Sequence, residues 1–226
     1  IAVSGITADR LTKIGPKRDR INVVPNGIDA EQIHSAPLPE TSYRSDGNPG
    51  FNVMFAGRLT ADKNINILLD AFDQIAANHD ATMGIIGDGP EAGRLHEHAA
   101  RLTHTDRIEF LGFLDDYEDV LGHMRAAEVF CSPSTREGFG LTYAEAMAAD
   151  CRVIAADHSE SAADEVIGDA GFLTAPTVDD LATVLDKTLA GERPQSDPVS
   201  RAKQFDWDIV ASQAEETYQR AIEDRW

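Results

Sequence analysis

After residue 50 the chain alternates between short apolar runs and segments in which apolar residues have a helical spacing. Between the first two runs, Ile65, Leu68, Leu69, Phe72 and Ile75 recur three and four positions apart, which is typical of an amphipathic helix. The apolar runs, each of the length of one buried strand, are residues 51–56, 82–86, 108–111, 129–131, 153–156 and 171–173. Strands that alternate with helices predict an α/β fold with a parallel sheet and helices on both faces. The loops that follow the strands of such a sheet meet at its carboxyl edge, where ligands bind.

The segments outside this alternation indicate how the chain is divided. Residues 21–24 predict a short strand that stops at the turn Pro25-Asn26-Gly27. Residues 35–50 contain three of the ten prolines, which is typical of a surface linker. Two helices are predicted near the end of the chain, at residues 181–189 and 207–222. We therefore divide the chain into residues 1–34, a surface linker at 35–50 and an α/β domain at 51–226.

The charge of the chain excludes some partners. With 39 acidic and 20 basic side chains, the net charge is −19, so most of the surface repels nucleic acid and anionic lipid. The regular apolar runs argue against disorder as the cause of the acid excess, and we interpret it as adaptation to high salt. Cys131 and Cys151 form neither a disulfide framework nor a zinc-ligand spacing. No apolar stretch reaches the length of a membrane span.

The loop after the first apolar run has features of a diphosphate site. Gly57 permits a tight turn, and Arg58 and Lys63 flank a loop that leads into a helix. A helix N-terminus attracts anions through its free N–H groups, and the two cations would add to that attraction. An ordinary solvated loop with surface ion pairs remains the alternative.

The loop at residues 132–141, which leads into a helix at 142–149, carries the strongest signal. Gly138 and Gly140 permit close approach to the backbone, and the N–H groups of Gly140, Leu141 and Thr142 would face outward at the helix start. Glu137 lies in this loop, and Glu145 follows about two turns into the Ala-rich helix. We expect Glu145 to be partly buried. A buried carboxylate needs hydrogen-bond donors, and the vicinal hydroxyls of a ribose supply two.

Two further loops give weaker signals. The glycines of residues 87–93, with Glu109 about twenty residues later, resemble a dinucleotide fingerprint, although their spacing departs from it. The acids of residues 113–119 are explained by a helix start, because negative charge stabilises that end of a helix. The motif Asp206-Trp207-Asp208 is likewise interpreted as a helix cap, so we expect no metal site.

Taken together, these loops resemble the group 1 (family 4) glycosyltransferases, which are retaining enzymes of the GT-B fold. The spacing of Glu137 and Glu145 matches the family's E-x7-E motif. The other segments that carry the resemblance are residues 53–59 with Lys63, 87–90, 133–134, 137–141, 145–148, 25–29, Phe205, Trp207 and Tyr218. The resemblance implies that the chain is the C-terminal, Rossmann-like half of such an enzyme. It also implies that the acceptor-binding half is missing apart from a remnant at residues 1–15, and that residues 1–34 comprise this remnant and the connection between the two halves.

The resemblance also implies roles for individual residues. Arg58 and Lys63 would hold the donor diphosphate, Glu137 would contact the donor sugar, and Glu145 would bind the ribose. The remaining donor-binding residues implied by the family are Gly57 in the loop of Arg58 and Lys63, Leu114 and Asp116 near the base, and Gly138, Phe139, Gly140, Leu141 and Thr142 near the sugar and phosphate. The chain departs from the family pattern at Asn64, Asp150 and Arg152, where Gly, Gly and Pro are usual, and at Ser161-Ala162, where paired Gly is usual.

The implied activity is metal-independent hexosyl transfer, with retention, from a UDP-, GDP- or ADP-sugar to a glycan, lipid or small-molecule acceptor. We expect a cytoplasmic protein, or one attached to the inner membrane face through the missing half. Two alternatives stay open from the sequence. One is a non-catalytic nucleotide-sugar-binding module, and the other is a nicotinamide-dinucleotide-binding protein that uses residues 87–93.

Overall fold

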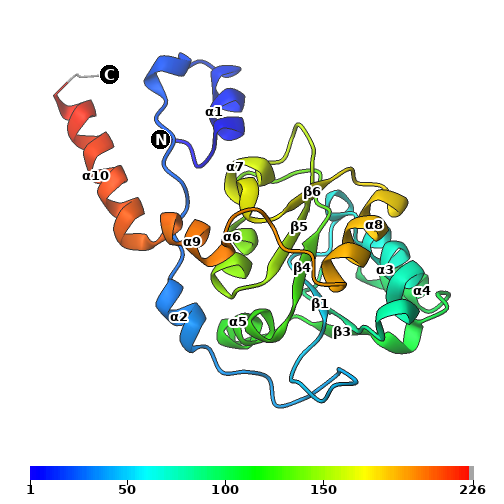
Figure 1. Ribbon diagram of the computed structural model, residues 1–226. Coiled ribbons are helices and arrows are strands. Elements are labelled where there is room, and N and C mark those ends of the chain that lie inside the picture. Colours follow the sequence, from blue (N-terminus) through cyan, green and yellow to red (C-terminus); the bar gives the residue numbers. More distant parts are fainter. Residues whose placement is uncertain (224–226) are drawn as a thin grey trace.

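A computed structural model describes residues 1–223 and contains one six-stranded parallel sheet (Figure 1). The strand order is β3-β2-β1-β4-β5-β6. The strands are β1 (Val53–Ala56), β2 (Met83–Ile86), β3 (Ile108–Gly112), β4 (Val129–Ser132), β5 (Arg152–Ala156) and β6 (Phe172–Thr174). The α/β class and the six predicted strands are confirmed, with ends that differ from the sequence pattern by at most two residues. Residues 224–226 of the predicted domain lie outside the described part.

Helices cover both faces of the sheet, because its strands are apolar on both sides. In β1, Val53 and Phe55 pack with the core of one face, whereas Met54 and Ala56 pack with the core of the other. The first face is covered by α3 (Ile65–His79), α4 (Ala92–Ala99) and α8 (Val178–Leu189). The second is covered by α2 (Ala30–Ser35), α5 (Tyr117–Ala126), α6 (Leu141–Ala148), α7 (Ala163–Ile167) and α9 (Pro198–Ala202). Double coverage explains why β1, β2 and β4 are buried along their whole length.

In Figure 1 the two ends of the described chain lie on the same side of the molecule, away from the sheet. Helix α1 (Gly5–Thr12) belongs to the first segment of the chain, residues 1–34. Helix α10 (Trp207–Ile222) is the last described helix and spans the residues that the sequence predicts. The strand predicted at residues 21–24 is reduced to an isolated bridge between Ala2 and Val23. Short 3₁₀ turns complete the fold at η1 (Arg18–Arg20), η2 (Ala61–Lys63), η3 (Thr105–Arg107), η4 (Gly168–Ala170) and η5 (Lys203–Phe205).

A turn near residue 27 joins the first segment to the last helix. The Ile28 N–H donates to the Phe205 carbonyl, and the Trp207 N–H donates to the Ile28 carbonyl. The backbone at Gly27 runs so close to the Trp207 ring that a Cβ there would lie 2.4 Å from it. Ile28 and Ile33 belong to the core beneath α5 and α6. Residues 27–33 therefore attach the first segment of the chain to the second face of the sheet.

The strand order places two loops at the centre of the carboxyl edge. The order reverses between β1 and β4, which are neighbours in the sheet. Ligands of open α/β sheets bind at such a reversal, because the loops diverge there to opposite faces. The loops after these two strands carry the charged candidates Arg58, Lys63 and Glu137. None of the described helices is long and apolar enough to cross a membrane.

Candidate functional site

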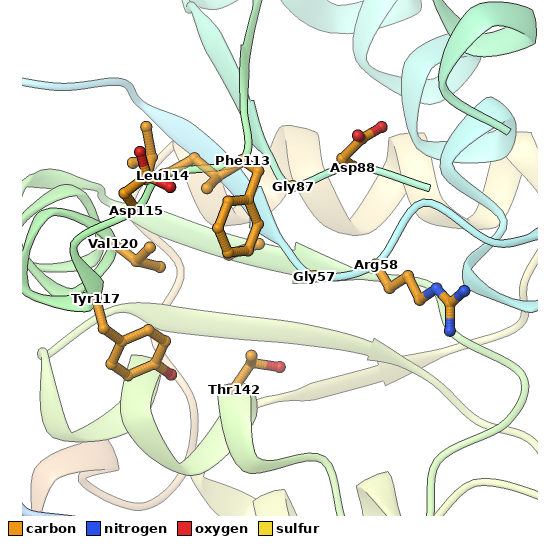
Figure 2. Close-up of a pocket in the computed structure, with 12 residues that line it drawn as sticks. Gly57, Arg58, Gly87, Asp88, Phe113, Leu114, Asp115, Tyr117, Val120 and Thr142 are labelled. Carbon is orange, nitrogen blue, oxygen red and sulfur yellow. The ribbon is translucent and has the colours of Figure 1, made fainter. Parts of the chain in front are cut away.

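A cavity of about 540 Å³ opens at this carboxyl edge. In Figure 2, Leu114, Val120 and Tyr117 surround one side, and the Arg58 side chain lies on the opposite side. The lining residues are Ala56, Gly57, Arg58, Ile86, Gly87, Asp88, Phe113, Leu114, Asp115, Tyr117, Val120 and Thr142. They follow strands β1, β2 and β3 or begin helices α5 and α6. The cavity thus offers an apolar side next to a cationic one.

The two predicted cations lie in different surroundings. Arg58 is exposed at the cavity, and none of the described residues forms an ion pair with its side chain. Lys63 donates to the carboxylate of Glu137, and both side chains are largely buried, at 17% and 15% exposure. The structure therefore brings Lys63 and Glu137 together, although 74 residues separate them. The pair joins the loop after β1 to the loop after β4.

Hydrogen bonds of Asn64 and Thr135 hold together the two loops that supply Lys63 and Glu137. Asn64 adopts the left-handed conformation with φ of 51°, which explains why a glycine is usual at its position. Its side-chain amide donates to the Pro133 carbonyl at 3.0 Å and to the Thr135 hydroxyl at 3.3 Å. The Thr135 N–H in turn donates to the Asp62 carbonyl. The departure from the family pattern at Asn64 therefore links the loops that carry Lys63 and Glu137.

The backbone around Glu137 is held from two further directions. The Glu137 carbonyl accepts from the Ala162 N–H, in a bridge to the segment before α7. The carbonyl of Gly138 accepts from the hydroxyls of Ser4 at 2.5 Å and Thr7 at 3.1 Å. Residues from the first segment of the chain thus contact the loop directly. The sequence gives no sign of this contact, because more than 130 residues separate the partners.

Helix α6 begins where the sequence predicts its free N–H groups. Gly140 is the N-cap residue with φ of 87°, and a Cβ there would lie 2.4 Å from the Tyr143 ring. The close contact and the positive φ both require glycine. No side chain caps this helix start, which leaves the amides of Leu141 and Thr142 available for an anion. Thr142 lines the cavity, whereas Phe139 is buried against Phe205.

Glu145 is buried, as expected, but it does not line the cavity. Its side chain lies behind Tyr117, whose hydroxyl is 2.7 Å from both carboxylate oxygens. Burial raises the pKa of Glu145 to about 7, and the hydrogen bond from Tyr117 opposes that rise. The same burial and the neighbouring carboxylate raise the pKa of Tyr117. Tyr117 was missed in the sequence, where nothing connects it with a residue 28 positions later.

The loop after β3 lies on the same side of the cavity as Tyr117 and Val120 (Figure 2). Phe113 is 72% exposed at its rim, and Leu114 and Asp115 line it. Asp116 does not line the cavity: its carboxylate accepts from the Glu118 N–H at 2.9 Å and caps α5. The prediction that the acids of residues 113–119 belong to a helix start is thus confirmed for Asp116.

The glycine loop after β2 has a packing explanation. A Cβ at Gly87 would lie 1.9 Å from the Gly57 carbonyl oxygen, and one at Gly89 would lie 2.4 Å from that of Leu59. The glycines therefore allow the β2 loop to pack against the β1 loop. Glu109 lies within β3 and not at the cavity. Packing therefore accounts for the glycines, although Gly87 lines the cavity, and Glu109 is not placed to contact a ribose there.

Of the predicted site residues, Gly57, Arg58, Leu114 and Thr142 line the cavity. Those that do not line it are Lys63, Asp116, Glu137, Gly138, Phe139, Gly140, Leu141 and Glu145. Asp206 caps α10 by accepting from the Asp208 N–H, as predicted. Among residues 1–223, no cluster of His, Cys, Asp or Glu side chains could hold a metal ion.

The sequence of this chain matches a family profile and curated proteins of known name. The profile of the family described as "Glycosyl transferases group 1" matches residues 46–205. Phosphatidyl-myo-inositol mannosyltransferase of Mycobacterium tuberculosis is 33% identical over 210 residues, which cover 87% of this chain and 53% of that protein. The chain thus spans about half the length of the curated relatives it matches.

Solved structures share the fold. The Anabaena protein HepE in complex with UDP and glucose matches with a TM-score of 0.78 and 27% identity, over 96% of this chain and 62% of that one. The apo form of the lipopolysaccharide outer core galactosyltransferase WaaB matches with a TM-score of 0.75 and 21% identity, over 100% of this chain and 61% of that one. Both likenesses place the described sheet in the C-terminal half of a GT-B structure.

Proposed function

Since the chain belongs to the group 1 glycosyl transferases, we propose that it binds the nucleoside-diphosphate sugar in an enzyme that transfers the hexosyl group to an acceptor with retention. The observation that carries this proposal is the cavity at the carboxyl edge of the sheet, where the strand order reverses between β1 and β4. The exposed Arg58 side chain lies on one side of this cavity, and apolar side chains lie on the other. HepE, which has the same fold, is described with UDP and glucose bound. A nucleoside fits the apolar side, and a diphosphate fits the cationic side.

The diphosphate is assigned to three groups of this chain. Arg58 and Lys63 supply positive charge, and the free amides at Leu141 and Thr142 supply hydrogen bonds. These groups stabilise the negative charge that develops on the departing nucleotide, and electrostatic stabilisation of this kind is a large part of catalysis. No metal is needed in this scheme, since cations and amides hold the phosphates.

The base, ribose and sugar are assigned to the remaining residues. Backbone groups of Leu114 contact the base, and Asp116 accepts from a guanine edge with the carboxylate oxygen that does not cap α5. Glu145 binds the ribose hydroxyls. Glu137 and the backbone of residues 138–140 contact the sugar. We assign acceptor binding to the part of the enzyme outside this chain, with a glycan, lipid or small molecule as acceptor.

Three further assignments belong to this proposal. Residues 1–34 are part of the acceptor half and its connection, residues 35–50 are a linker, and residues 51–226 form the donor domain. The protein is cytoplasmic, or attached to the inner membrane face through the acceptor half. The net charge of −19 is an adaptation to high salt.

The test is calorimetric titration of the chain with UDP, GDP, ADP and NADH, each with and without EDTA. One nucleoside diphosphate should bind, unaffected by EDTA, and NADH should not. Arg58→Ala should weaken that binding by about 10- to 100-fold, since it removes a charged hydrogen bond. Arg94→Ala, at an 81% exposed cation on α4, is the control and should bind like wild type. Binding of NADH but of no nucleoside diphosphate would refute the proposal.

Salt dependence of stability is a separate check on the surface charge. Repulsion among the excess acids should destabilise the fold in dilute buffer, and the screening length falls to about 3 Å at 1 M salt. The melting temperature should therefore rise steeply between dilute buffer and 1 M KCl. A melting temperature that does not depend on salt would contradict the salt-adaptation interpretation.

A further inference from the structure

The contact between Tyr117 and Glu145 raises a question about how the cavity receives a nucleotide. Glu145 is 5% exposed and does not line the cavity, whereas Tyr117 is 48% exposed and does. Figure 2 shows the Tyr117 ring at the cavity beside Thr142, the second residue of α6. A ribose in the cavity therefore meets the phenol before it meets the carboxylate.

The geometry of this contact matches that expected for a diol. The phenol has one proton, yet its oxygen lies 2.7 Å from both Oε1 and Oε2 of Glu145. It therefore sits in front of the carboxylate, between its two oxygens. Two vicinal hydroxyls that donate to a carboxylate, one to each oxygen, need the same space. Tyr117 and a ribose cannot both occupy it.

The contact also satisfies a group that needs a donor. None of the described residues forms an ion pair with Glu145, and its helical neighbours Ala144, Ala146 and Met147 are apolar and buried. A buried carboxylate without a donor is costly. The phenol is the donor in the ligand-free protein, and a ligand that displaces it must supply donors of its own.

The position of Tyr117 in its helix allows it to move. It is the first residue of α5, and the side chains that fix α5 to the core are Val120, Leu121 and Met124. Rotation of the Tyr117 side chain into the open cavity leaves those contacts in place. The phenol can therefore leave the carboxylate without unfolding the helix.

We propose that Tyr117 occupies the ribose position on Glu145 in the nucleotide-free protein and is displaced when a ribonucleotide binds. This inference rests on the proposed function, since it takes Glu145 as the ribose contact. The exchange makes the site selective for nucleotides with both ribose hydroxyls, because a ligand without them cannot replace the hydrogen bond of the phenol and therefore leaves Tyr117 in place.

Tyr117→Phe provides a direct test, since it keeps the ring and removes only the competing hydroxyl. The chain is titrated with UDP, GDP and ADP and with their 2′,3′-dideoxy forms. The nucleoside diphosphate that binds wild type should bind the variant about tenfold more tightly, because it no longer competes with a charged hydrogen bond. The 2′,3′-dideoxy form of this nucleotide should bind the variant with the same affinity as wild type. Tyr218→Phe, on the exposed face of α10, is the matched control and should bind like wild type.

The outcomes separate this inference from the function on which it rests. Unchanged or weaker ribonucleotide binding by Tyr117→Phe, with normal binding by wild type, would overturn the displacement and leave the proposed function standing. Absence of any nucleoside-diphosphate binding by folded wild type would overturn both. In a Glu145→Gln background, Tyr117→Phe should lose most of its effect, and an undiminished gain there would also contradict the exchange.

Discussion

Glu137 and Glu145 lie eight positions apart, yet the regions around them differ in kind. The loop that holds Glu137 is fastened by Ala162, Ser4 and Thr7, and the Glu137 carboxylate faces the ammonium of Lys63. Helix α6 holds Glu145 among apolar residues, where its partner is a neutral phenol. The first region holds an ion pair, and the second holds a buried carboxylate whose side-chain partner is Tyr117. The separate roles that we propose for the two carboxylates rest on this difference.

The largest expected effect comes from breaking the charged pair. Lys63→Met removes one diphosphate cation and leaves Glu137 unpaired beside the phosphates. Nucleoside-diphosphate binding should weaken by about 100-fold, since a charged hydrogen bond to the diphosphate is lost. Calorimetry measures this, with Lys187→Met on the exposed surface of α8 as the control. If Lys63→Met binds like wild type, Lys63 does not hold the diphosphate.

A second effect, on stability, comes from the buried Glu145. Its pKa is raised to about 7 from 4.5, so its contribution to stability is fully present below pH 4.5 and is lost as the pH rises through 7. Glu145→Gln does not titrate. Relative to wild type, this variant should gain about 2–3 kcal/mol in free energy of unfolding between pH 5 and pH 8. Denaturant unfolding at the two pH values measures the gain, and a constant difference would show that Glu145 titrates normally.

The smallest effect is the pH dependence of nucleotide affinity. Ribose hydroxyls donate best to the ionised carboxylate, so binding should weaken as the pH falls below about 7, where Glu145 takes up a proton. Between pH 8 and pH 6 the loss should be about tenfold. Glu145→Gln corrects for titration of the phosphates themselves. An equal pH dependence in the variant and in wild type would place the ribose elsewhere.

The sequence predicts more of the fold than of the site. Alternation of apolar runs is enough to locate all six strands, because strands buried on both sides must be apolar. Residues 21–24 fail as a strand because a single bridge to Ala2 is all the pairing they find. The left-handed conformations of Asn64 and Asp150 explain in hindsight why glycine is usual at both positions.

The candidate site is only partly predictable, because its pairings depend on how distant elements meet. Residue types indicate that Arg58, Lys63, Glu137 and Glu145 belong at the carboxyl edge. Nothing in the spacing indicates that Lys63 faces Glu137, since that contact requires β1 and β4 to be neighbours. The contact of Tyr117 with Glu145 likewise requires the starts of α5 and α6 to converge.

The central claim, that Glu145 serves the nucleotide and Glu137 serves the sugar, is tested most directly by comparing Glu145→Ala with Glu137→Gln in calorimetric titrations with the bare nucleoside diphosphate. Glu145→Ala should weaken binding by about 10- to 100-fold, the equivalent of one charged hydrogen bond. Glu137→Gln should leave the affinity nearly unchanged. If folded Glu145→Ala binds like wild type, or if Glu137→Gln loses as much affinity as Glu145→Ala, the division of roles is wrong.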